Sequence, residues 1–328
     1  MSDKQPERDS DKTKPEDTDF RQQRLRAWQP LLTPKWVIWT FLVVGIIFLP
    51  LGIGILVTSH NIVEMTQRYD DVACSVGVFP GCTKYVSVTF PEDVDGPIYF
   101  YYKLTNFFQN HRRYVQSRSD AQLAGESGTT SSCEPLEYYN DKLLYPCGLI
   151  ANSHFSDKFT AQVTPNGEVI PTALAGKEWD DSSIAWESDI STKFKDLYDP
   201  VTDKPLPDNM SRDAPSGTLP DLSNQHLMVW MRPAGVSTFR KLNRKIDRSF
   251  KKGDKITVSI TDSFDVSAFG GSKSVVFSNV SWIGGKNDFL AYAYIITGAV
   301  CIFLGILFAI KEMIAPRPLG EMKAIRNA

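Results

Sequence analysis

Two long stretches without a charged side chain constrain this chain more than any other feature. They are residues 36–59 (WVIWTFLVVGIIFLPLGIGILVTS) and residues 289–310 (FLAYAYIITGAVCIFLGILFAI). A helix of roughly 20 residues crosses a hydrocarbon core about 30 Å thick, and both stretches reach that length. The alternative is a buried helix of a soluble protein, but such helices seldom run this far without a charge. We therefore predict two transmembrane helices.

The flanks of these stretches predict their orientation. Short basic flanks remain in the cytosol, and the inner flanks are leaner in bases and mixed in charge. The prediction is an integral membrane protein with both termini cytosolic and the residues between the spans outside the cytosol. The outer flanks carry Arg21, Arg24, Arg26 and Lys35 before the first span, and Lys311, Arg317, Lys323 and Arg326 after the second.

Six segments follow from this division. The N-terminal tail holds seven acids, four bases and no apolar side chain except Met1, which predicts disorder. The next segment, FRQQRLRAWQPLLTPK, mixes bases with apolar residues. It could lie on the anionic inner leaflet, where each base contributes about 1 kcal/mol, or dock on a partner. The predicted segments are a disordered cytosolic tail (1–19), a cytosolic juxtamembrane segment (20–35), a first transmembrane helix (36–59), an extracytosolic β-rich domain (60–288), a second transmembrane helix (289–310) and a cytosolic tail (311–328).

Cysteine usage agrees with an oxidising compartment for the central domain. Cys74, Cys82, Cys133 and Cys147 all lie between the spans, whereas Cys301 lies inside the second. Four thiols allow three pairings, and the shortest loops favour Cys74 with Cys82 and Cys133 with Cys147. A four-cysteine zinc site is the alternative, but such sites show C-x2-C spacing, which the sequence lacks.

Two acceptor motifs for N-glycosylation fall in the same domain, at Asn209-Met-Ser and Asn279-Val-Ser. Asn209 sits in a stretch rich in Pro, Asp and Ser, which is typical of an exposed loop. Asn279 lies in a predicted strand about ten residues before the second span. We therefore favour Asn209 as the modified residue.

The central domain has the pattern of a β fold. Residues 85–90, 255–261 and 274–280 alternate β-branched or aromatic residues with polar ones, which is typical of half-buried strands. Residues 98–106 are richer in aromatics and indicate a more fully buried strand. The fold class predicted is a membrane protein in which two transmembrane helices flank a mainly-β extracytosolic domain, an antiparallel sandwich with irregular insertions. Helices are expected only at residues 107–117 and 237–246.

The sequence offers no catalytic, cofactor-binding or metal-binding motif. It has four histidines, none at metal-ligand spacing from another, and no H-E-x-x-H, G-x-S-x-G or phosphate-binding glycine loop. A net charge of −2 without a basic cluster argues against nucleic-acid binding. These observations favour a binding or assembly role without a cofactor.

Small residues recur every fourth position along the second span. Such a row lets helix backbones approach closely, whereas a lipid-facing surface gains nothing from small side chains. The two spans could simply pack on each other, but small residues on both helices favour a larger membrane partner. Cys301 is expected to pack as a small apolar residue. The row consists of Ala293, Thr297, Cys301, Gly305 and Ala309.

Six stretches of the sequence resemble the accessory beta subunits of type IV P-type ATPases, the phospholipid flippases, known as the Cdc50/Lem3-like family. The resemblance runs from about residue 20 to 320, in the same order and topology. The stretches are FRQQRLRAWQP (20–30), IYFYYKLTNFFQNHRRYV (98–115), YPCGLIANS (145–153), VWMR (229–232), FGGSK (269–273) and IGG (283–285).

The resemblance implies a non-catalytic subunit that assists assembly, endoplasmic reticulum exit and activity of a lipid-translocating ATPase. It implies residence in the endoplasmic reticulum, the Golgi or endosomes, or the plasma membrane. It places the cytosolic contact with the catalytic subunit at residues 20–30, which include Phe20, Arg21, Arg24, Arg26 and Trp28, and it maps a central disulfide onto Cys133 and Cys147. The alternatives are a ligand-binding or adhesion receptor and a membrane-tethered hydrolase.

Overall fold

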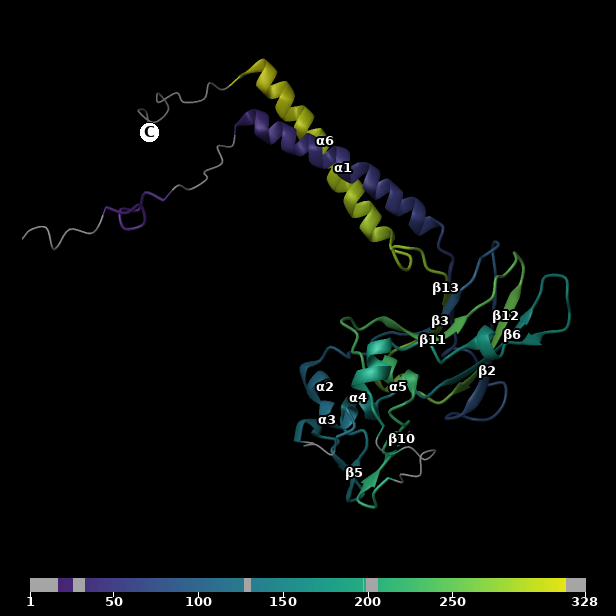
Figure 1. Cartoon of the computed structure of the whole chain (residues 1–328). Coiled ribbons are helices and arrows are strands. Elements are labelled where there is room, and N and C mark those ends of the chain that lie inside the picture. Colours follow the sequence, from purple (N-terminus) through teal and green to yellow (C-terminus); the bar gives the residue numbers. More distant parts are fainter. Residues whose placement is uncertain (1–16, 26–32, 127–130, 197, 199–205, 317–328) are drawn as a thin grey trace, which may run out of the picture. The chain divides into compact units, whose positions relative to one another are not determined.

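The structure, a computed structural model, describes residues 17–25, 33–126, 131–196, 198 and 206–316 (Figure 1). The chain divides into two compact units. One comprises Met1–Ile53 with Leu290–Ala328, and the other is Gly54–Phe289.

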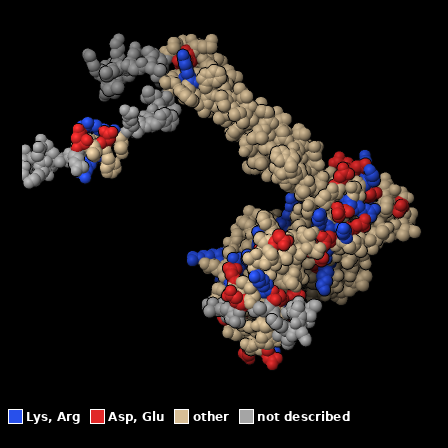
Figure 2. Space-filling model, viewed as in Figure 1, with Lys and Arg blue, Asp and Glu red and all other residues tan. Residues whose placement is uncertain are grey.

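Two long helices form the first unit. Helix α1 spans Pro34–His60 and helix α6 spans Asp288–Ile314. Within the described residues these two helices are long and apolar enough to cross a membrane. They extend the predicted stretches by a few residues at each end. Figure 2 shows their surface almost free of charged side chains until the end of α6.

Two four-stranded antiparallel sheets form the body of the second unit (Figure 1). The first sheet has the order β1-β13-β3-β11, and the second has the order β2-β12-β6-β7. The bounds are β1 Glu64–Arg68, β13 Lys273–Ser278, β3 Ile98–Leu104, β11 Phe239–Ile246, β2 Cys82–Thr89, β12 Lys255–Asp262, β6 Lys158–Thr164 and β7 Thr172–Ala173.

Aromatic side chains fill the space between the sheets. The Phe100 ring of β3 lies 5.2 Å from the Phe159 ring of β6 and 5.0 Å from the Phe277 ring of β13, measured between centroids. Val258 and Ile260 of β12 are fully buried in the same core. The sheets therefore pack face to face, and the predicted mainly-β sandwich is confirmed.

Two insertions without long elements carry the short helices and strands. One joins β3 to β6, and the other joins β7 to β11. The helices are α2 Arg112–Gln116, α3 Asp120–Leu123, α4 Leu149–Asn152 and α5 Gln225–Trp230, with single turns at Ser131–Cys133, Gly176–Trp179 and Asp189–Lys193; a further turn, Ser267–Phe269, lies between β12 and β13. The strands are β4 Tyr138–Tyr139, β5 Lys142–Leu144, β8 Met210–Ser211, β9 Asp213–Ala214 and β10 Gly217–Thr218.

The predicted helix at residues 237–246 is wrong, because this segment is the edge strand β11. The apolar residues Phe239, Leu242 and Ile246 recur at helical spacing, but a bulge between Leu242 and Arg244 shifts the strand register. The buried positions between Phe239 and Ile246 are filled by Lys241 and Asn243. Polar residues at buried positions therefore concealed the alternation of a strand.

Two other expectations need correction. Helix α2 covers only five residues of the predicted segment 107–117. Strand β13 was expected to be half-buried, but all six of its residues are buried. Strand β3 instead alternates buried and half-buried residues.

Candidate partner-binding surfaces and their supporting frame

Glycines bring α1 and α6 into close contact. A Cβ at Gly298 would lie 2.9 Å from the Leu49 backbone nitrogen, and a Cβ at Gly45 would lie 2.5 Å from Ile302 Cγ1. Gly52 and Gly305 are equally crowded, by Ile295 and Leu42. Any larger side chain at these positions would push the helices apart.

The small-residue row of α6 only partly coincides with this contact. Residues four apart on a helix drift by about 40° per step, so five of them wind over about 160° of the surface. Gly305 is buried against α1, whereas Ala293, Cys301 and Ala309 are half-buried and Thr297 is exposed. The α1-facing row is instead Ile295, Gly298, Ile302 and Gly305. Thr297 therefore remains available on a surface that α1 does not cover.

Of the juxtamembrane segment, the structure describes residues 20–25 and 33–35. Residues 18–24 form a tight turn, in which the Arg24 backbone nitrogen donates to Asp19 O at 2.7 Å. Phe20 is 75% exposed, and Arg24 forms an exposed ion pair with Asp17 at 3.6 Å. Arg21 lies on the same turn, and Arg26 and Trp28 lie outside the described residues.

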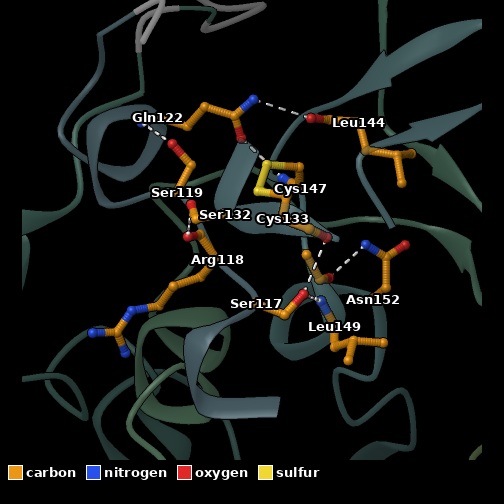
Figure 3. The surroundings of a disulfide bond; sticks show 11 residues. Ser117, Arg118, Ser119, Gln122, Ser132, Cys133, Leu144, Cys147, Leu149 and Asn152 are labelled. Carbon is orange, nitrogen blue, oxygen red and sulfur yellow. Dashed lines mark hydrogen bonds between the residues drawn. A yellow bond between two sulfur atoms is a disulfide. The ribbon is translucent and has the colours of Figure 1, made fainter. Parts of the chain in front are cut away.

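Two disulfides join the four cysteines of the β domain, Cys74 to Cys82 and Cys133 to Cys147. The second is buried in the insertion between β3 and β6 (Figure 3). Its Cys147 backbone nitrogen donates to Gln122 Oε1 at 2.9 Å, while Ser117 Oγ donates to Cys133 O at 3.1 Å. The bridge thus fixes α3 and α4 to one another through their neighbouring polar groups.

Two motif glycines occupy positions that no other residue fits. Gly148 has φ of +102°, and a Cβ there would lie 2.2 Å from Ser117 O, next to the central disulfide. A Cβ at Gly271 would lie 2.6 Å from Thr105 O and would strike the Phe269 ring. The YPCGLIANS and FGGSK motifs therefore serve the packing of the domain.

A buried network of four charges links the two sheets, and sequence reasoning missed it. Lys273 of β13 contacts Asp157 at 2.8 Å and also Asp262. Lys84 of β2 contacts Asp262 at 2.7 Å. Each of the four side chains is at most 7% exposed. The only sequence signal was a lysine at the end of FGGSK, directly before an apolar strand.

Backbone and phenol donors complete this network. Asp157 Oδ1 accepts from the Ser263 and Phe264 nitrogens at 2.6 Å each, and Asp157 Oδ2 accepts from Tyr69 Oη at 2.7 Å. Burial raises the pKa of Tyr69 well above its usual value, and the Asp157 charge adds to this effect. The phenol therefore stays a donor, and the two lysines balance the two carboxylates.

A second charged cluster surrounds the VWMR motif. Trp230 is buried and donates from Nε1 to Ile150 O at 2.8 Å. Arg232 pairs with Asp189 at 2.5 Å and lies over the Trp186 ring. Burial, assisted by Arg232, lowers the pKa of Lys241 to about 8. These contacts fix α5 against β11 and the turn at Asp189.

The two glycosylation candidates differ in their surroundings. Asn209 is exposed in the turn before β8. Asn279 follows directly after β13 and is half-buried, and its Oδ1 accepts from the Val63 nitrogen at 2.9 Å.

A cavity lined by described residues has a volume of about 660 Å³. Its polar lining includes Asp181, His226 and Arg244, which pair with one another; Arg244 lies 2.9 Å from Asp181. In the described part of the chain, no group of three His, Cys, Asp or Glu residues could hold a metal ion.

The arrangement defines a class of protein: a two-span membrane protein with a disulfide-bonded β sandwich inserted between the spans. Comparison with known proteins identifies the family. The profile of the LEM3 (ligand-effect modulator 3)/CDC50 family matches residues 55–318. The chain belongs to this family.

Curated relatives align along almost their whole length. ALA-interacting subunit 3 of Arabidopsis thaliana is 38% identical, with 94% of this chain and 89% of the relative covered. Cell cycle control protein 50A of Mus musculus is 36% identical, with 90% and 88% covered. Phospholipid-transporting ATPase accessory subunit CRF1 of Saccharomyces cerevisiae is 31% identical, with 94% and 87% covered.

Proposed function

We propose that this chain is the non-catalytic accessory subunit of a phospholipid-translocating P-type ATPase. The observation that carries the proposal is the alignment, over 94% of this chain, with a yeast protein named as an accessory subunit of such an ATPase. The name ALA-interacting subunit, given to a plant relative, also describes a protein that acts through a partner. The partner of this chain would be the catalytic subunit, a large membrane ATPase.

Three surfaces are available for that partner. The first is the cytosolic turn with Phe20, Arg21 and Arg24, continued by Arg26 and Trp28. The second is the surface of α6 around Thr297, bordered by Ala293, Cys301 and Ala309. The third is the extracytosolic sandwich. Three linked contacts raise affinity, because each later contact forms within an already associated complex. The cytosolic turn could also contact anionic lipid.

The proposed orientation follows from the basic flanks. Both termini lie in the cytosol, the two helices cross the membrane, and the sandwich lies in the lumen or outside the cell. The two disulfides support this side for the sandwich, because disulfides persist in oxidising compartments. The subunit would accompany its ATPase from the endoplasmic reticulum to the Golgi, endosomes or plasma membrane.

Co-expression tests the assembly role. Cells that lack this chain are expected to retain the catalytic subunit in the endoplasmic reticulum, and restoring the chain is expected to release it. Uptake of a fluorescent phosphatidylserine analogue should fall and recover in parallel. Normal export and uptake without the chain would contradict the proposal.

Substitutions in α6 should separate partner binding from the packing of the two spans. Thr297→Leu adds bulk on a surface that α1 leaves exposed, so it should reduce co-purification of the catalytic subunit severalfold while the α1–α6 contact persists. Crosslinking between introduced cysteines at residues 48 and 294, whose native rings lie 5.1 Å apart across the helix pair, measures that contact. Phe303→Leu, at an exposed apolar position of the same helix, is the matched control. Equal co-purification of Thr297→Leu and the control would exclude this surface.

Asn209 is expected to carry an N-linked glycan in preference to Asn279. Asn209→Gln should increase the electrophoretic mobility by the amount expected for the loss of one glycan. Treatment of this variant with peptide N-glycosidase should then cause no further change in mobility. Asn279 is half-buried and already accepts a hydrogen bond, so Asn279→Gln should leave the mobility unchanged. A mobility shift seen only with Asn279→Gln would reverse the assignment.

A further inference from the structure

Two sets of hydrogen bonds tie the chain that leaves α1 to the chain that enters α6. Ser59 Oγ donates to Asp288 Oδ1 at 2.5 Å and accepts from the Asn287 nitrogen at 3.1 Å. Four residues beyond Ser59, the Val63 nitrogen donates to Asn279 Oδ1 at 2.9 Å, and the Asn279 nitrogen donates to Val63 O at 3.4 Å. The two connectors therefore run together between the helix ends and the first sheet.

The two connectors differ in length. Between the two sets of hydrogen bonds, one connector consists of residues 60–62 and the other of residues 280–286. The longer connector folds into a tight turn, in which the backbones of Ser281 and Gly284 exchange two hydrogen bonds of 2.9 Å. Gly284 has φ of +112°, which favours glycine. Trp282 lies at the tip of this turn.

An arginine from the first sheet lies close to the turn. A Cβ at Gly285 would lie 2.6 Å from Arg240 Nη2, so glycine leaves room for this approach. Arg240 pairs with Glu64 at 2.6 Å and lies over the Tyr101 ring at 4.9 Å. The second glycine of the IGG motif therefore lets an arginine of β11 lie beside the turn.

The turn presents apolar side chains that the described chain leaves largely or partly exposed. Trp282 is 86% exposed, Val280 is 42% exposed, and Phe289 in the first turn of α6 is 82% exposed. Exposing a tryptophan to water on a hydrogen-bonded turn does not stabilise the fold. These side chains therefore indicate an apolar or amphipathic environment around the turn.

Chain length limits the distance of this turn from the membrane. Four residues from Ser59 to Val63 span at most about 14 Å. The hydrogen bonds at Asn279 therefore lie no more than about 14 Å from the hydrogen bonds at Asp288. The uncharged stretch of α6 starts at Phe289, directly beside Asp288. The interfacial region lies immediately outside the hydrocarbon core, and tryptophan is enriched there because its ring is apolar and its N–H is polar.

We propose that the Trp282 turn, with Val280 and Phe289, binds the phospholipid surface of the extracytosolic leaflet and fixes the height of the sandwich above it. The side chains of the turn contact the lipid at the boundary between headgroups and acyl chains. The proposal rests on the two spans and on the contacts of the turn, and it holds whether or not an ATPase is bound.

Site-specific fluorescence in the full chain tests this proposal. Cys301→Ala removes the free cysteine, and Trp282→Cys then carries an environment-sensitive fluorophore. The purified protein is inserted into phosphatidylcholine nanodiscs, with or without brominated acyl chains. The label at residue 282 should show blue-shifted emission, strong quenching by the brominated lipid and weak quenching by aqueous iodide.

Val169→Cys is the matched control, because Val169 is 91% exposed in the loop between β6 and β7, far in the sequence from either span. Its label should be quenched by iodide and not by brominated lipid. Trp282→Phe in the unlabelled protein gives a second readout, since it should abolish part of the brominated-lipid quenching of the native tryptophan emission.

Two results would overturn the proposal. One is a label at residue 282 that iodide quenches as strongly as the control. The other is a label that becomes shielded only when the catalytic subunit is added, which would assign the turn to the protein partner instead of the lipid.

Discussion

Lys273→Met is expected to lower the free energy of unfolding by about 3–5 kcal/mol, because it leaves a buried pair of carboxylates short of one cation. Lys273 contacts both Asp157 and Asp262 and donates to Phe264 O at 2.5 Å. It is 2% exposed, so water cannot replace it. Chemical denaturation of the full chain in detergent, followed by tryptophan emission, measures the change.

Two further variants separate charge balance from lost packing. Lys255→Met removes an exposed lysine from β12 and should change stability by less than about 0.5 kcal/mol. Adding Asp157→Asn to Lys273→Met restores charge balance with the Lys84–Asp262 pair intact, so the double variant should be more stable than Lys273→Met alone. A double variant at least as unstable as the sum of the two single variants would refute the charge argument.

Removing the central disulfide is the second large effect. Replacing both Cys133 and Cys147 with alanine should cost about 3 kcal/mol, the value for a closed loop of about 15 residues. Both sulfurs are buried, and the bridge lies among the hydrogen bonds of Ser117 and Gln122 (Figure 3). Its loss should expose the insertion between β3 and β6 to limited proteolysis and retain the protein in the endoplasmic reticulum.

The other disulfide is the internal comparison. Cys74 and Cys82 are separated by eight residues, against fourteen for the central bridge, and Cys74 is exposed. Replacing Cys74 and Cys82 with alanine should therefore cost less and leave the insertion resistant to protease. Equal protease sensitivity of the two double variants would contradict the role given to the central bridge.

Local patterns predicted the parts of the fold that local chemistry determines. The spans were visible because an uncharged run of more than 20 residues is rare outside a membrane helix. Strand β12 was visible because its residues alternate between the core and solvent. Strand β11 was missed because Lys241 and Asn243 occupy its buried positions, which reversed the expected apolar pattern.

Long-range contacts could not be predicted in the same way. Lys84, Asp157, Asp262 and Lys273 come from four separate segments, and only the folded sandwich brings them together. Gly298 was not predicted as a contact residue because it lies outside the row of small residues at every fourth position. The α1 contact instead follows Ile295, Gly298, Ile302 and Gly305, which alternate steps of three and four.

The motifs that carry the family resemblance now have physical roles. Gly148 and Gly271 permit close backbone contacts, Lys273 links the sheets, and Gly285 makes room for Arg240. These roles support the folding of the β domain. Contacts with a partner would then be made by the surface residues around these motifs. This division fits a subunit whose function is assembly.

Affinity purification of the tagged full chain in mild detergent tests whether this chain is the subunit of a lipid-translocating ATPase. One large membrane ATPase should be recovered in a one-to-one ratio with this chain, and phospholipid should stimulate its ATP hydrolysis. Recovery of the chain alone, or with a soluble extracellular ligand and no ATPase, would contradict this role.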